Sequence, residues 1–82
     1  MGLVYKAVIG DETLSKVSIE TIGYFSSMRK AKTAIKNNLK LFCQKVASYD
    51  DEKCNRHFCV GKWIDEKNRF FGFFKIELIR VE

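Results

Sequence analysis

Six basic side chains gather in the middle of the chain, where they can bind anions or acidic protein surfaces. The segment between Thr21 and Tyr49 has six of the chain's 15 basic residues and none of its ten acidic residues. They are Arg29, Lys30, Lys32, Lys36, Lys40 and Lys45. The 82-residue chain has a net charge of +5, so the residues outside this segment sum to −1. This local excess favours an acidic partner, either a nucleic acid or an acidic protein surface.

The element expected to position these cations is an amphipathic helix from about Ser26 to Ala47. Apolar residues recur there at steps of three and four, which predicts one buried stripe. The stripe consists of Met28, Ala31, Ile35, Leu39, Phe42 and Val46. Ser26 or Ser27 can cap the helix. We expect Ile35, Leu39 and Phe42 in the core, and Arg29, Lys32, Lys36 and Lys40 on the neighbouring stripe with Lys30 beside it.

The charge of this predicted helix opposes its own dipole. A helix N-terminus has partial positive charge and favours acidic side chains, yet the first turn has Arg29 and Lys30. Each misplaced cation costs roughly 0.3–1 kcal/mol at low salt. A bound anion would relieve this cost, because free N–H groups and basic side chains converge there. The alternative is a solvated helix face that tolerates the penalty.

Strand patterns flank the predicted helix on both sides. Leu3–Ile9 is rich in β-formers, and Val17, Ile19 and Thr21 alternate with polar residues as in a half-buried strand. We predict two further strands at Phe58–Ile64 and Arg69–Val81, and an exposed loop at residues 48–56. In the last strand Phe74 and Ile76 share one face and Phe73 and Lys75 the other. We therefore predict one α+β domain over residues 1–82: ββαββ, with a four-stranded antiparallel sheet and one helix packed on one face.

Aromatic residues near the last turn exceed what one helix can cover. Phe70, Phe71, Phe73 and Phe74 fall within five positions, and Trp63 lies on the other side of the turn. Some of these rings should remain exposed or be buried by a second copy of the chain. We therefore count Phe70, Phe71 and Phe73 among the binding residues and consider a homodimer through this sheet face.

The segment from Arg69 to Ile76 resembles the aromatic strand motif of RNA-recognition domains, in which rings stack on bases. That family has a helix directly after its first strand, whereas here a second strand comes first. Stacking on single-stranded nucleic acid remains an alternative to protein binding.

Three cysteines and the single histidine offer a possible metal or nucleophile set. Cys43, Cys54, His57 and Cys59 provide the donor types of a structural zinc site, but no tight Cys-x2-Cys pair is present. His57 could activate a nearby cysteine, but the sequence has neither an orienting third group nor a phosphate-binding glycine loop. We interpret the cysteines as ordinary thiols and expect no metal, no cofactor and no enzymatic activity.

Composition assigns the chain to a soluble class. It is 46% hydrophobic and 30% charged, and it has no apolar run near the roughly 18 residues that span a bilayer. The sequence begins without a secretory signal, and an odd number of cysteines favours reduced thiols. We expect a cytoplasmic location and no membrane partner.

Short motifs in the middle and at the end of the chain form a further pattern. They are the turn Gly23-Tyr24-Phe25-Ser26-Ser27, the helical pairs Lys30-Ala31 and Ala34-Ile35, and the strand Phe74-Lys75-Ile76-Glu77-Leu78. This pattern resembles small uncharacterised domains from bacteriophage genomes, and the resemblance implies a phage or prophage accessory protein. Typical members have glutamates in the first helical turn, where this chain has Arg29 and Lys32.

Size, charge and this resemblance together predict a phage accessory protein that inhibits a host macromolecular complex. Its action would be of the anti-defence, anti-CRISPR-like kind, in the host cytoplasm. The expected partner is a host protein or nucleoprotein complex with an acidic surface, bound through the basic helix face. The alternatives are direct RNA or DNA binding by the basic helix and exposed aromatics, and a basic homodimeric structural protein.

Overall fold

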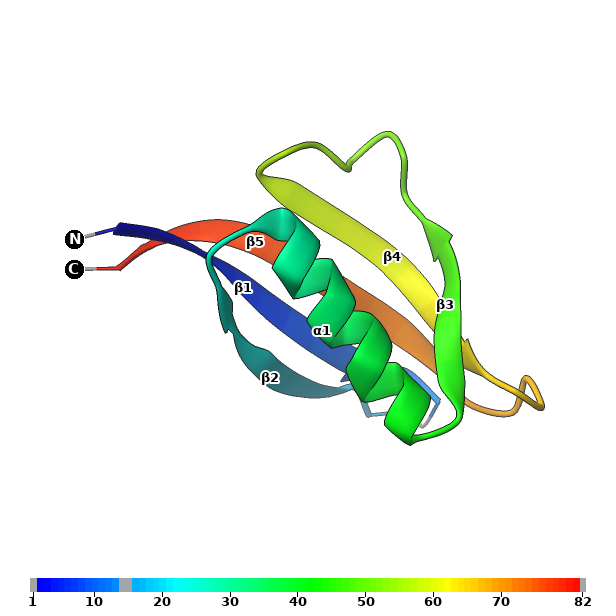
Figure 1. The fold of residues 1–82 in the computed structure, drawn as a ribbon. Helices are drawn as coiled ribbons and strands as arrows, with labels where there is room; N and C mark the ends of the chain where they lie inside the picture. The colour runs from blue at the N-terminus through cyan, green and yellow to red at the C-terminus, as the bar shows by residue number, and fades with distance from the viewer. Residues whose placement is uncertain (1, 14–15, 82) are drawn as a thin grey trace.

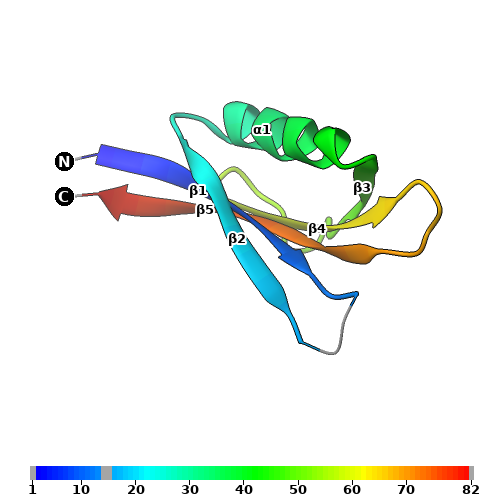
Figure 2. The same cartoon turned by 90° about the horizontal axis from the view of Figure 1, so that it is seen from below.

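The computed structural model describes residues 2–13 and 16–81 and contains six elements in the order ββαβββ (Figure 1). They are β1 (Gly2–Asp11), β2 (Ser18–Phe25), α1 (Met28–Leu41), β3 (Gln44–Tyr49), β4 (Phe58–Asp65) and β5 (Phe71–Val81). The strands form one antiparallel sheet in the order β2-β1-β5-β4-β3, and α1 lies across one face of it (Figures 1 and 2). The prediction of one antiparallel sheet with one helix is confirmed. The prediction of four strands in the order ββαββ is wrong, because the sheet has five.

The additional strand, β3, comes from the segment that was predicted to end the helix. The helix stops at Leu41, and Cys43 adopts a left-handed conformation with φ 57°. The amide of Cys43 then bonds to the carbonyl of Lys40 over 3.2 Å, which turns the chain out of the helix. Val46 therefore packs against the core from a strand instead of from the helix. Phe42, expected in the core, is 65% exposed, because it lies at the C-cap.

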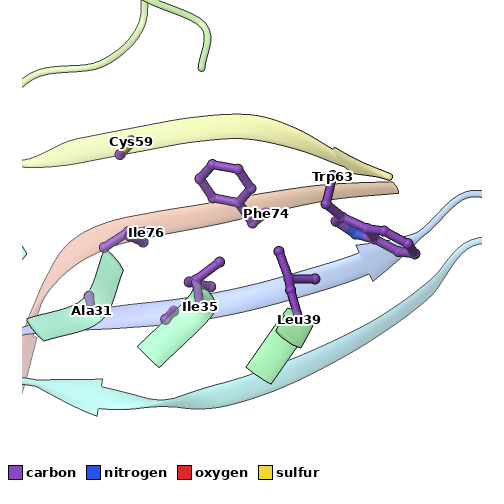
Figure 3. Close-up of a cluster of buried hydrophobic side chains, with 8 residues drawn as sticks. Ala31, Ile35, Leu39, Cys59, Trp63, Phe74 and Ile76 are labelled. Carbon is purple, nitrogen blue, oxygen red and sulfur yellow. The ribbon is translucent and has the colours of Figure 1, made fainter. Parts of the chain in front are cut away.

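The core lies between α1 and the sheet (Figure 3). Its buried residues are Ala7, Ala31, Ile35, Leu39, Cys59, Trp63, Phe74 and Ile76. Figure 3 shows Ala31, Ile35 and Leu39 pointing from the helix toward the sheet residues. The predictions that Ile35 and Leu39 are buried, and that Phe74 and Ile76 share a face, are confirmed.

The N-terminal pair of strands is present, but in β2 the side chains that face the core are not those of the predicted half-buried face. β1 and β2 pair antiparallel, and their register shifts between Ala7 and Val8. Ile19, expected in a half-buried face, is 64% exposed. Ile22 and Phe25 instead pack against the core. The bulge explains the error, because one extra residue reverses which side chains face the helix.

Three strand glycines lie directly opposite aromatic residues. Gly72 pairs with Trp63, Gly61 with Phe74, and Gly10 with Phe73. In each pair the ring occupies the space that a Cβ would take on the facing glycine. The Trp63 indole N–H also donates a buried 3.0 Å hydrogen bond to the carbonyl of Gly10. These glycines allow large rings to lie flat on the sheet.

Candidate functional site

The start of α1 is capped as the sequence predicts and has no acidic residue in its first turn. Ser27 is the N-cap, and its hydroxyl accepts a 3.1 Å hydrogen bond from the backbone N–H of Lys30. The Lys30 ammonium donates to the Ser26 hydroxyl, also over 3.1 Å. These contacts fix the helix terminus, and Arg29 and Lys30 are exposed there.

Four basic residues of the helix line two separate hollows beside it. Lys36 and Lys40 line a surface hollow of about 580 Å³ on the side of β3. We call this hollow the β3 groove; its other lining residues are Gln44, Lys45, Val46, Ala47, Ser48 and Tyr49. Arg29 and Lys30 line a separate hollow of about 590 Å³ on the side of β2, together with Phe25. The residues of the predicted stripe therefore do not all line one hollow.

Lys32 has a different environment from the other helix cations. It is half-buried, and its ammonium lies 5.4 Å from the centre of the Tyr49 ring. Tyr49 in turn packs edge-on against Phe74, with ring centroids 5.5 Å apart. This cation–π contact ties α1 to β3 beside the groove and gives Lys32 a structural partner.

The ion pairs of the protein leave out the helix cations. The described part of the chain has four ion pairs: Lys53–Asp50, Lys62–Glu12, Arg69–Asp65 and Lys75–Glu77. None of them includes a residue of α1 or Lys45. The β3 groove therefore has three exposed lysines and no acidic residue in its lining. The charged side chains of this lining are therefore all positive, which favours an anionic partner.

Two of the three candidate phenylalanines, Phe71 and Phe73, lie away from this groove. Phe71 and Phe73 alternate with buried Phe74, so they lie on the face of the sheet opposite α1, which we call the open face. Phe71 is 48% exposed, and Phe73 is half-buried over Gly10. Phe70 is 43% exposed in the β4–β5 turn, beneath the Arg69 guanidinium at 5.5 Å. The rings of Phe71 and Phe73 therefore do not form one continuous surface with the basic helix, whereas Phe70 lines a hollow that also includes Gln44 of the β3 groove.

The cysteines and the histidine do not converge on one point. Cys54 and Cys59 are adjacent, with 3.2 Å between their sulfur atoms. Cys43 is exposed at the other end of β3, and His57 is exposed in the loop before β4. Within residues 2–13 and 16–81, no three His, Cys, Asp or Glu side chains are grouped closely enough to hold a metal ion.

Cys59 should be the least reactive thiol. Burial, with a further contribution from the hydrogen bond with Cys54, raises its pKa from 9.0 to about 11. At pH 8 we expect iodoacetamide to modify exposed Cys43 and to spare Cys59 in the folded protein. Peptide mass mapping measures the extent of modification of each cysteine. Rapid labelling of Cys59 under native conditions would contradict its burial.

The raised pKa of Cys59 also predicts that the free energy of unfolding depends on pH. The unfolded thiol ionises near pH 9.0, whereas the folded thiol stays neutral to about pH 11. The stabilisation from neutral Cys59 is therefore complete below pH 9.0 and is lost as the pH rises toward 11. Urea unfolding of wild type and Cys59→Ala at pH 7 to 10.5 isolates this effect. The wild type should lose more stability than the variant over that range.

Sequence reasoning missed the β3 side of the candidate site. Gln44, Val46 and Tyr49 provide the strand wall of the β3 groove, whereas the sequence pattern predicts them in the end of the helix and in the loop. The signal that was available is the alternation of Gln44 and Val46 with exposed Lys45 and Ala47.

Fold and site together define a small α+β protein with a basic helix over an antiparallel sheet. No family model, curated protein or solved structure matches the chain. Among the residues that the structure describes, no helix has the length and apolar composition needed to cross a membrane.

Proposed function

We propose that this protein is a small accessory protein of the phage type that binds and inhibits a host complex, in the manner of anti-CRISPR proteins, in the host cytoplasm. The observation that supports this is the asymmetry of its charge pairing. On the open face, Lys62 lies 3.2 Å from Glu12, and Lys75 lies 3.6 Å from Glu77. The helix cations have no such partner in the described part of the chain. An acidic surface of another molecule would supply the missing carboxylates.

Binding through this face has a clear physical gain. Exposed lysines steer an acidic partner into contact and select against partners of like charge. A partner carboxylate near Arg29 and Lys30 also meets the positive end of the helix, which offsets the cost of placing cations there. The proposed mode of inhibition is steric: the bound protein covers the acidic surface that its host target needs.

Direct nucleic-acid binding is the second candidate, and the geometry supports it less. A module that combines basic residues with stacking rings needs both on one surface. Here Phe71 lies on the open face, and the two lysines nearest in register on that face are in ion pairs. The helix lysines alone would give sequence-independent binding to phosphates.

A homodimer through the open face is a separate possibility that the apolar surface there supports. Phe71 and Ile19 are both substantially exposed on this face. Burying them against a second copy would leave the helix face free for the host partner. Sedimentation of wild type and Phe71→Lys gives the oligomeric state directly.

Charge reversal in the β3 groove tests the main proposal. Lys36→Glu with Lys40→Glu should reduce capture of the host partner at least about tenfold, because two attractive contacts become repulsive. Both residues are exposed, so folding should be preserved, as circular dichroism and thermal unfolding can show. Capture from host lysate is quantified with and without nuclease, and inhibition of the host activity is measured in parallel.

A matched control places the same change of net charge elsewhere. Arg56→Glu with Arg80→Glu alters two exposed cations that lie outside α1 and line neither of these hollows. This variant should bind as the wild type does. Equal loss in both variants would indicate a general charge effect and would refute the groove as the site. Loss of capture after nuclease would instead favour the nucleic-acid candidate.

A further inference from the structure

Among the strands that the structure describes, none pairs with the outer edge of β3, and this edge opens into the β3 groove. β3 is the last strand of the sheet order, so only one of its sides pairs with β4 (Figure 1). Its other side has backbone N–H and C=O groups that can pair with a strand from another chain. The helix forms the opposite wall of the groove with Lys36 and Lys40.

The register shows which amides face the groove. Two backbone bonds close the ends of the β3–β4 pair: Glu66 N–H to the Cys43 carbonyl, and Asp50 N–H to the Val60 carbonyl. Gln44 and Tyr49 lie just inside these bonds, in pairs that are not hydrogen-bonded to each other. Their amides therefore point away from β4, and alternation gives Val46 the same direction. These three residues also line the groove.

We propose that the β3 groove binds an extended acidic segment of a partner protein, which pairs with β3 as an added antiparallel or parallel strand. Backbone bonds to Gln44, Val46 and Tyr49 would give affinity that does not depend on sequence. Acidic side chains of the segment would meet Lys36, Lys40 and Lys45. This inference rests on the proposed function and names the shape and chemistry of the partner at that site.

Charge and backbone chemistry select this occupant over the other candidates. A second copy pairing edge to edge would bring two sets of groove lysines together, which is repulsive. A nucleic acid would satisfy the lysines, but it has no alternating N–H and C=O groups to pair with the strand edge. An acidic polypeptide strand satisfies both.

Two peptides that differ only in backbone hydrogen bonding test the proposal. The probe is an acetylated, amidated hexapeptide of alternating Glu and Val with a fluorophore, and its matched control is N-methylated at alternate residues. Both have the same charge and side chains, but the control lacks the donors that a strand needs. We expect fluorescence anisotropy to show binding of the probe, weakened at least about tenfold by N-methylation. Amide NMR signals of Gln44 and Val46 should shift on titration.

Protein variants separate this inference from the proposed function. Lys36→Glu with Lys40→Glu should weaken probe binding about tenfold, and Arg56→Glu with Arg80→Glu should leave it unchanged. Strand addition is refuted if both peptides bind equally well. It is also refuted if the probe does not bind while charge reversal still abolishes capture of the host partner. In either case the basic site itself is retained. Probe binding that is indifferent to charge reversal, with host capture also unchanged, overturns both. Displacement of the probe by a single-stranded oligonucleotide at equal concentration overturns the polypeptide assignment.

Discussion

Replacing Trp63 by alanine is expected to destabilise the protein by about 3–5 kcal/mol. The side chain is 1% exposed and is the largest fully buried side chain of the core. Its removal leaves a cavity between Leu39 and the sheet and breaks the bond from the indole N–H to the carbonyl of Gly10. Urea unfolding followed by far-ultraviolet circular dichroism gives the free energy of unfolding without depending on the lost fluorophore.

Trp63→Phe is the matched variant for this prediction. It retains a ring over Gly72 but removes the hydrogen-bond donor. Its loss of unfolding free energy should therefore be clearly smaller than that of Trp63→Ala. A value for Trp63→Ala within about 1 kcal/mol of the wild type would mean that the indole is not the centre of the core.

Replacing Gly72 by alanine should have the second largest effect, about 3 kcal/mol or more, by overpacking. A Cβ at this position would fall on the carbonyl oxygen of Gly10 and lie 2.6 Å from Nε1 of Trp63. The first obstacle is backbone in a paired strand, which cannot rotate away. No described glycine has a positive φ, so the effect is steric and not conformational. Thermal and urea unfolding measure the loss.

Two other glycines calibrate the Gly72 result. A Cβ at Gly2 meets nothing within 4 Å, so Gly2→Ala should change stability by less than about 0.5 kcal/mol. The three atoms nearest to a Cβ at Gly10 all belong to the ring of Phe73, a side chain that can move. The loss of stability in Gly10→Ala should therefore lie between those of Gly2→Ala and Gly72→Ala. Similar stability of Gly72→Ala and Gly2→Ala would refute the close approach of Trp63 to the strand.

Residue periodicity predicted the helix core because Ile35 and Leu39 have no competing pattern around them. It failed from Cys43 onward because the segment 44–49 fits two periods at once. Val46 lies four residues after Phe42, as in a helix, and two residues after Gln44, as in a strand. No glycine or proline marks the stop, and the left-handed residue is Cys43, which has no preference for that conformation.

The candidate site was predictable in its charges and not in its shape. The basic residues of the helix are local in sequence, so their common element followed from the pattern. The groove requires β3 beside α1, and the division of the cations between two hollows requires the position of the helix over the sheet. The pairing of Trp63 with Gly72 depends on strand register, which no local pattern contains.

The pairing of β1 with β5 has a consequence for how the chain reaches this fold. These two strands are neighbours in the middle of the sheet, from Gly2 opposite Val81 to Asp11 opposite Gly72. The β1–β2 and β3–β4 pairs are each local in sequence, but within the sheet they join only through β5. During synthesis neither half can complete the shared core until β5 has left the ribosome, and closing so long a loop slows the folding step. A nascent chain halted before Phe71 should therefore remain open to proteases, and folding should follow release of the last strand.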